Sequence, residues 1–251
     1  MDAFDTPFLV LAVALVAQWL ATYAGDAVRK KMRPLKEEER EDFDLIRTAA
    51  LTLLGLIIGF SFAMAVSRYD QRKNLEEAEA NAIGTAYVRA DILPAEQATK
   101  LRELLKKYLD QRVAFYLARD RGQVGQINAE TAKLQAELWS TVLSAVTSRQ
   151  TAVEALVVAG MNDVLNSQGY TQAAWWNRIP VSAWALMGLI AIACNLLFGY
   201  GERRGSALAL VLPFIVSIAF FLIADIDSPR AGVIRVMPQN LLALSQTMNP
   251  K

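Results

Sequence analysis

One stretch of the chain, residues 45–93, begins as an apolar segment long enough to cross a membrane and continues without a proline as a charged amphipathic segment. From Thr48 onward about nineteen residues carry no charge, and in a helix they span roughly 30 Å, the thickness of one hydrocarbon core. Beyond Ser67, alanine and leucine recur at helical spacing as far as Pro94, which ends the pattern. The sequence therefore predicts one helix that starts in the bilayer and extends into water.

Composition supports a membrane protein and excludes several kinds of chemistry. Of the 251 residues 54% are apolar, which is more than soluble domains of this size usually contain. There is no histidine, and the single Cys194 lies inside an apolar run. We therefore expect no enzyme activity, cofactor, metal site or intrachain disulfide, and the net charge of +1 gives no reason to expect nucleic acid. Asp225 and Asp227 are better explained as partners of Arg230 than as metal ligands.

Four apolar segments predict an all-α protein with four transmembrane helices, at residues 8–23, 48–66, 181–200 and 206–224. The second helix would extend into an extramembrane helical hairpin domain. The expected divisions are residues 1–66 for the first two spans and their charged connector, 67–174 for the extramembrane domain, 175–226 for the third and fourth spans, and 227–251 for the tail.

The extramembrane domain is expected to contain two helices after the central one. The first runs from Pro94 to about Arg119, residues 120–125 form a turn, and a second, uninterrupted helix covers residues 127–165 and ends at 166–170. Arg112 lies off the apolar stripe, which predicts an exposed side chain. Within the third span, Asn195 is expected to hydrogen-bond between helices.

The ends of the spans suggest how the chain sits in a membrane. Trp175, Trp176 and Arg178 have the composition of an interfacial anchor. The connectors at residues 26–44 and 201–205 are denser in lysine and arginine than the opposite flanks. The positive-inside rule therefore favours cytoplasmic connectors and an extramembrane domain outside the cell.

Two rows of side chains share the second span. Gly55, Gly59 and Ala63 form a small-residue row that allows close helix packing, and Leu56 and Phe60 form a neighbouring row. One interpretation is that the small row packs on another helix while the larger side chains point into an assembly or a pore. The other is an ordinary packing row beside an ordinary lipid-facing row.

Three segments resemble the bacterial bestrophin-like family of small four-span membrane proteins: residues 54–69 (LGLIIGFSFAMAVSRY), 77–87 (EAEANAIGTAY) and 227–232 (DSPRAG). The family is distantly similar to bestrophins, which are pentameric chloride channels with a narrow apolar neck. This resemblance implies that Thr52, Leu56 and Phe60 occupy neck positions, although Thr52 stands where that family has an apolar residue. It also implies that Arg68 and Tyr69 lie at the pore mouth and that the large domain is cytoplasmic, against the charge count. The acidic calcium-binding cluster of bestrophins has no counterpart.

The resulting expectation is a multi-pass inner-membrane protein that forms a homo-oligomer, by resemblance a pentamer, and conducts chloride or other anions. The alternative is a non-conducting membrane scaffold or sensor whose helical domain binds a partner. Besides itself and the lipid bilayer, no other partner is indicated.

Overall fold

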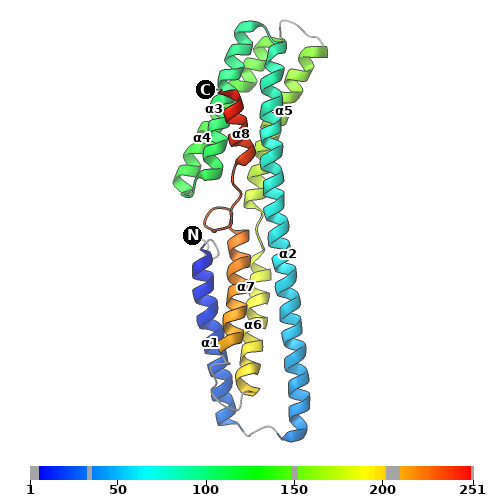
Figure 1. The fold of residues 1–251 in the computed structure, drawn as a ribbon, viewed down its shortest axis with the longest axis vertical. Coiled ribbons are helices and arrows are strands. Elements are labelled where there is room, and N and C mark those ends of the chain that lie inside the picture. Colours follow the sequence, from blue (N-terminus) through cyan, green and yellow to red (C-terminus); the bar gives the residue numbers. More distant parts are fainter. Residues whose placement is uncertain (1–5, 33–35, 148–151, 202–209, 250–251) are drawn as a thin grey trace. The chain divides into compact units, whose positions relative to one another are not determined.

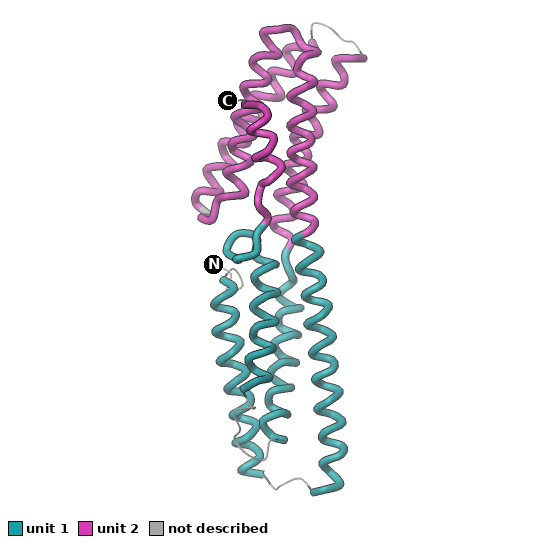
Figure 2. Tube along the Cα trace, in the orientation of Figure 1, with its two compact units in different colours: residues 1–69, 178–235 teal, residues 70–177, 236–251 magenta. Residues whose placement is uncertain are grey.

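The computed structural model describes residues 6–32, 36–147, 152–201 and 210–249. The chain divides into two compact units (Figure 2). Unit 1 contains residues 1–69 and 178–235, and unit 2 contains residues 70–177 and 236–251.

Every regular element in the described residues is helical, which confirms the all-α class (Figure 1). In chain order they are α1 (Pro7–Lys31), α2 (Glu37–Arg89), the short 3₁₀ helix η2 (Ala90–Ile92), α3 (Ala95–Leu117), α4 (Arg121–Val146), α5 (Ala152–Trp176), α6 (Val181–Gly201), α7 (Val211–Asp227) and α8 (Gln239–Met248).

Helix α2 confirms the long central helix predicted from residues 45–93, and it begins earlier, at Glu37. Three glutamates, Glu37, Glu38 and Glu39, occupy its first turn, where negative charge stabilises the N-terminal end of the helix dipole. The helix tightens into η2 before Pro94 because the residue preceding a proline disfavours the helical conformation.

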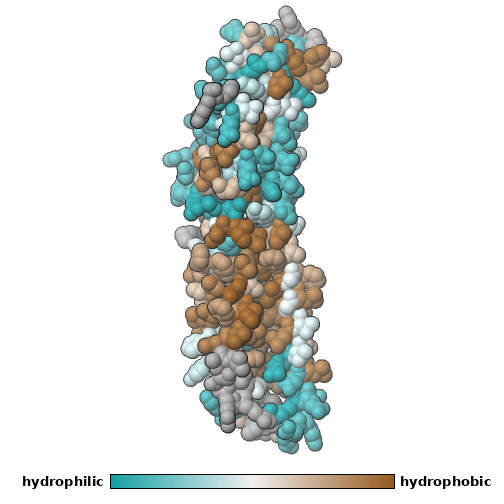
Figure 3. All heavy atoms as spheres, viewed as in Figure 1, coloured by the Kyte–Doolittle hydropathy of each residue, from teal (hydrophilic) through white to brown (hydrophobic). Residues whose placement is uncertain are grey.

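Unit 1 is a bundle in which α1 packs against α6 and α7. Thr22 contacts Asn195 of α6, while Phe8 and Gln18 contact Phe221 and Ser217 of α7, so α1 is antiparallel to α7. Side chains of α2 join the apolar core that α6 and α7 form. Figure 3 shows hydrophobic side chains gathered over the helices of unit 1, as a bilayer requires.

Three described helical stretches are long and apolar enough to cross a membrane: Pro7–Lys31, Glu37–Ile92 and Ala152–Gly201. The fourth expected span, residues 206–224, begins outside the described residues. Its described part is α7, an apolar helix of 17 residues whose side chains Val216, Phe220 and Ile223 are buried in the core of unit 1.

Unit 2 combines the last turns of α2 with η2, α3, α4, α5 and α8. Helix α3 packs on α4 and α8, and α5 packs on α4 and η2. The turn predicted at 120–125 is wrong, because α4 already begins at Arg121. The Asp120 carboxylate accepts the N–H of Gln123 and caps this helix, so Gly122 and Gly125 lie within it.

The single helix predicted over residues 127–165 is also wrong. Helix α4 ends at Val146 and α5 begins at Ala152, so two helices replace one. Apolar periodicity is equally regular on both sides of the break, and the intervening sequence is polar rather than rich in glycine or proline. Helix α5 then continues through the predicted end at 166–170 to Trp176.

Candidate functional site

The predicted neck residues lie on a face of α2 that has no partner within the described part of unit 1. Leu56 is 53% exposed and Phe60 is 65% exposed, and Thr52 is exposed as well. The hydroxyl of Thr52 donates to the carbonyl of Thr48 at 2.9 Å, as threonines in helices often do.

The small-residue row lies on this same unpartnered face. A Cβ added at Gly55 or at Gly59 would meet no atom within 4 Å, and Ala63 is exposed. The residues of α2 that pack against the rest of unit 1 come from the other side of the helix: Leu54, Ser61 and Ala65. Thus the described protomer leaves both rows uncovered. We define the exposed α2 face as Thr52, Gly55, Leu56, Gly59, Phe60 and Ala63.

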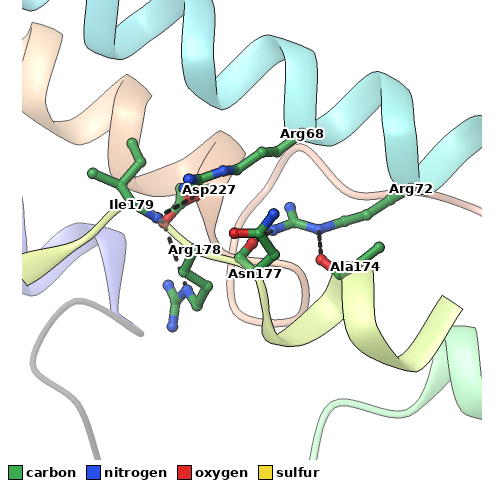
Figure 4. Close-up of polar contacts among 7 residues, drawn as sticks. All are labelled: Arg68, Arg72, Ala174, Asn177, Arg178, Ile179 and Asp227. Carbon is green, nitrogen blue, oxygen red and sulfur yellow. Dashed lines mark hydrogen bonds and ion pairs between the residues drawn. The ribbon is translucent and has the colours of Figure 1, made fainter. Parts of the chain in front are cut away.

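The two predicted mouth residues have different surroundings. Arg68 directs its guanidinium to the carboxylate of Asp227, with Nη1 at 3.5 Å from Oδ1 (Figure 4). Tyr69 is half-buried and packs on the apolar core of unit 1. Of the two residues expected at the pore mouth, Arg68 therefore already has a carboxylate partner within unit 1.

Asp227 is the centre of a polar cluster at the end of α7. Its side chain is 3% exposed, and both of its oxygens accept the backbone N–H of Ile179, at 3.1 and 3.2 Å. Nε of Arg178 lies 3.6 Å from Oδ2 (Figure 4). Because Ile179 precedes α6, Asp227 joins the end of α7 to the start of α6 and to α2.

Asp225, two residues earlier, binds the loop that follows α7. Its carboxylate accepts the N–H groups of Val233 and Ile234 at 2.7 and 2.8 Å, which closes the loop after α7. Among the described residues, no group of three or more acidic, histidine or cysteine side chains could hold a metal ion.

Unit 2 contains buried charges of its own. Arg72 is 1% exposed and donates from Nε to Ala174 O and from Nη2 to Asn177 O, both at 3.2 Å (Figure 4). Glu76 accepts the N–H of Leu241 at 2.9 Å and the amide of Asn240 at 2.6 Å, and so holds the N-terminus of α8.

One helical turn further along α2, Glu79 is fully buried. It pairs with Nε of Arg112 and accepts hydrogen bonds from Tyr116 Oη at 3.3 Å and Thr171 Oγ1 at 3.2 Å. The Arg112 guanidinium also lies over the Phe115 ring, 4.4 Å from its centroid. The prediction that Arg112 is exposed is therefore wrong, because its charge is matched inside the bundle by a glutamate from α2.

This cluster shifts the titration of its neighbours. Burial raises the pKa of Tyr108, and the nearby charge of Glu79 raises it further. Burial and Glu79 raise the pKa of Tyr116 in the same way. Burial is the largest single influence on Arg112 and lowers its pKa, but the charge and hydrogen bond of Glu79, together with the nearby Tyr108 and Tyr116, raise the pKa above its ordinary value.

The expected interfacial anchors separate in the structure. Trp176 is 74% exposed, whereas Trp175 is buried in unit 2, with its ring centroid 4.9 Å from that of Phe115 and 5.4 Å from that of Tyr116. Trp175 is therefore a core residue and is not available to the headgroup region. Arg178, the third expected anchor, reaches Asp227.

Sequence reasoning missed the two carboxylates that organise unit 2, Glu76 and Glu79. Asp227 was expected to pair with Arg230, and the arginines placed against its carboxylate include Arg68 and Arg178. The sequence signal that could have found Glu76 and Glu79 is their spacing, which places both on the side of α2 that carries the buried Arg72. Asn195, in contrast, was predicted correctly: its Nδ2 donates to Gln18 Oε1 at 3.0 Å, and its Oδ1 accepts from Thr22 at 3.3 Å.

Solved structures of bacterial bestrophin homologues share this fold. A crystal structure of a bacterial bestrophin homologue from Klebsiella pneumoniae is 14% identical, with 96% of this chain and 95% of that chain covered and a TM-score of 0.65. A singly substituted variant of the Klebsiella homologue is 11% identical over 95% of this chain and 93% of that chain, with a TM-score of 0.68. At this identity the likeness establishes the fold alone.

No curated protein sequence matches the chain. The bestrophin-like domain, by contrast, matches residues 10–241, which is nearly the whole length. Together with the shared fold, this match settles the relationship: the chain belongs to the bestrophin-like family.

Proposed function

We propose that the protein is an oligomeric, multi-pass channel of the bacterial inner membrane that conducts chloride or similar anions, and that the exposed α2 face forms its neck. The observation that carries this proposal is the pair of large apolar side chains, Leu56 and Phe60, that stand 53% and 65% exposed on α2. Membership of the bestrophin-like family supports a channel. The resemblance to bestrophins favours five subunits.

The proposed neck works by excluding water. Rings of Leu56 and Phe60 from several subunits form a dry constriction, and ions pass only when it is wetted. The edge of a phenyl ring carries partial positive charge, so a weakly hydrated anion is disfavoured less than a cation at Phe60. Thr52 adds a ring of hydroxyl groups on the same face of α2.

The small-residue row gives the neighbouring subunit room to approach. Gly55 and Gly59 have open space where a Cβ would stand, so another helix can come close to the α2 backbone there. A Gly59→Ile substitution is expected to weaken assembly. Gly188→Ile in α6, where a Cβ also meets no atom, is the matched control. Light scattering of the detergent-solubilised protein measures the change in mass.

The channel itself is tested with purified protein in planar bilayers. We expect chloride current from the wild type, and a several-fold larger current from Phe60→Ala because the constriction widens. Phe62→Ala is the control, since Phe62 is 41% exposed but lies on another side of α2.

Two outcomes contradict the proposal. The absence of chloride current from both the wild type and Phe60→Ala contradicts conduction, and an equal response to Phe60→Ala and Phe62→Ala contradicts a neck formed by the exposed α2 face. A protein that is monomeric in detergent and in membranes would favour a scaffold or sensor instead.

A further inference from the structure

We propose that the part of α2 that belongs to unit 2 carries a surface on which copies of this chain pack, and that Asn74 and Asn81 set the register of this contact. This inference rests on the proposed function, in which several copies gather around the exposed α2 face. We call the surface the α2 seam and define it by six residues: Gln71, Asn74, Ala78, Asn81, Thr85 and Val88.

The α2 seam has the spacing of a contact between helices. Its six residues follow one another at intervals of three and four, the repeat by which one helix stays in contact with a neighbour over several turns. All six are exposed, and Val88 is 67% exposed. The described residues of unit 2 therefore leave this side of α2 uncovered.

Another side of the same helix shows what this spacing does within the protomer. Its buried residues also follow one another at intervals of three and four: Arg72, Glu76, Glu79, Ile83, Ala86 and Ala90. They pack inside unit 2, where Glu79 pairs with Arg112 of α3 and Glu76 holds α8. Thus α2 has two sides with the spacing of a contact, and the protomer buries one of them.

The α2 seam contains no charge, although the helix around it is highly charged. Seven of the twelve residues from Arg68 to Glu79 are charged, and none of the seven lies on the seam. Asp70, Lys73 and Glu77 are exposed beside it. A solvated face does not exclude charge, whereas the centre of a protein–protein interface is depleted in it. The composition therefore favours a protein partner.

The partner is a second copy of the chain. The same intervals run back along α2 through Ser67 and Met64 to Phe60, all of them exposed, so the seam continues the row that begins on the exposed α2 face. Copies that meet at Phe60 bring this row of each α2 together in parallel. Asn74 and Asn81 then face their counterparts, and an asparagine at such a position specifies register and subunit number.

Thiol crosslinking in membranes tests the contact. Cys194 is the single cysteine and is buried, so Cys194→Ala gives a chain without thiols, into which Asn74→Cys or Asn81→Cys places one. Lys73→Cys is the matched control, because Lys73 is exposed next to Asn74 but points about 100° away around the helix. With a short bis-maleimide, we expect several-fold more crosslinked dimer from each seam variant than from the control.

An inserted charge tests the same surface without a crosslinker. Asn81→Asp places a carboxylate on the seam of every copy, and like charges that meet across the contact repel each other. We expect a lower mass by light scattering in detergent, and recovery of the mass in about 1 M salt, which screens the repulsion. Asn162→Asp, at an exposed asparagine of α5, should leave the mass unchanged.

The outcomes separate this inference from the channel. Crosslinking at Asn74 and Asn81 that is no stronger than at Lys73, or an unchanged mass of Asn81→Asp, would overturn the α2 seam even in a protein that conducts chloride. Strong crosslinking on the seam of a protein that carries no current would support the seam and overturn the channel. A monomeric wild type would overturn both.

Discussion

The backbone of Gly199 lies directly against the carbonyl oxygen of Thr22: a Cβ added at Gly199 would be 2.0 Å from that oxygen. The contact is reciprocal, because a Cβ at Gly25 would be 2.2 Å from the carbonyl oxygen of Leu196. Asn195 adds its side-chain hydrogen bonds to Gln18 and Thr22 at the same place. Helices α1 and α6 are therefore joined by backbone contact and by buried amides, which are the two devices that hold helices together in lipid.

The first prediction follows from this contact. Gly199→Ala must push α1 away from α6, and we expect it to lower the unfolding temperature of the detergent-solubilised protein. Gly188→Ala in the same helix should be neutral or slightly stabilising, because its added Cβ meets no atom within 4 Å and alanine favours helix. Equal unfolding temperatures for these two variants would contradict the close approach.

The second prediction concerns the buried pair of Glu79 and Arg112. Glu79→Gln leaves the Arg112 charge without its partner inside unit 2, and removing one member of a buried pair typically costs about 3–5 kcal/mol. Denaturant unfolding followed by circular dichroism measures this loss. Glu130→Gln breaks the exposed pair with Lys133 and should have little effect.

A double variant sharpens this test. Glu79→Leu combined with Arg112→Met removes both charges and should recover part of the stability lost in Glu79→Gln. If the double variant is as unstable as the single one, the loss comes from packing rather than from an unpaired charge.

The third prediction is a dependence on alkaline pH. The pKa of Tyr108 is raised above its ordinary value of 10.0 in the folded protein, mainly by burial, and that of Tyr116 is raised in the same direction. The folded state therefore holds these protons more tightly than the unfolded state. Their contribution to stability is complete below pH 10 and is lost as the pH rises above it.

For each buried tyrosine, the free energy of unfolding should fall by up to about 1.4 kcal/mol for every pH unit above the ordinary pKa of the side chain. Unfolding free energies measured between pH 9 and 11 check the slope. Tyr108→Phe should make it shallower, and Tyr170→Phe, at a side chain that is 64% exposed, should not. A slope that is the same in all three proteins would refute this origin.

The fourth prediction concerns the start of α4. Asp120→Ala removes the carboxylate that accepts the Gln123 N–H, and losing such a cap typically costs about 1 kcal/mol. Asp110→Ala, at an exposed aspartate on α3, is the control. Thermal unfolding measures both, and a loss no greater at Asp120 than at Asp110 would show that the cap contributes nothing.

Much of the fold could be predicted from local patterns. Hydropathy and helical spacing predict the long α2, the apolar spans and the interhelical hydrogen bonds of Asn195. Both signals can be read from one segment without knowing its neighbours. The exposed Leu56 and Phe60 could be grouped on one face for the same reason. The pattern of one segment does not tell what covers that face, because the cover would come from residues outside the segment.

The errors arise where distant residues decide the outcome. Arg112 has the pattern of a solvated residue until Glu79 is placed beside it, and Trp175 has that of a membrane anchor until Phe115 and Tyr116 surround it. The reversal between α4 and α5 is hidden because apolar spacing resumes with nearly the same period after residue 151. Asp120 was a visible cap signal, but the two glycines after it favoured a turn.

The attachment of α8 to Glu76 constrains the order in which the protein can be completed during translation. Leu241, whose N–H reaches the Glu76 carboxylate, is synthesised 165 residues later and only after α6 and α7. In the nascent chain, the Glu76 carboxylate therefore lacks its Leu241 partner while α6 and α7 are being synthesised. The hydrogen bond between Leu241 and Glu76 can thus form only after α6 and α7 have been synthesised.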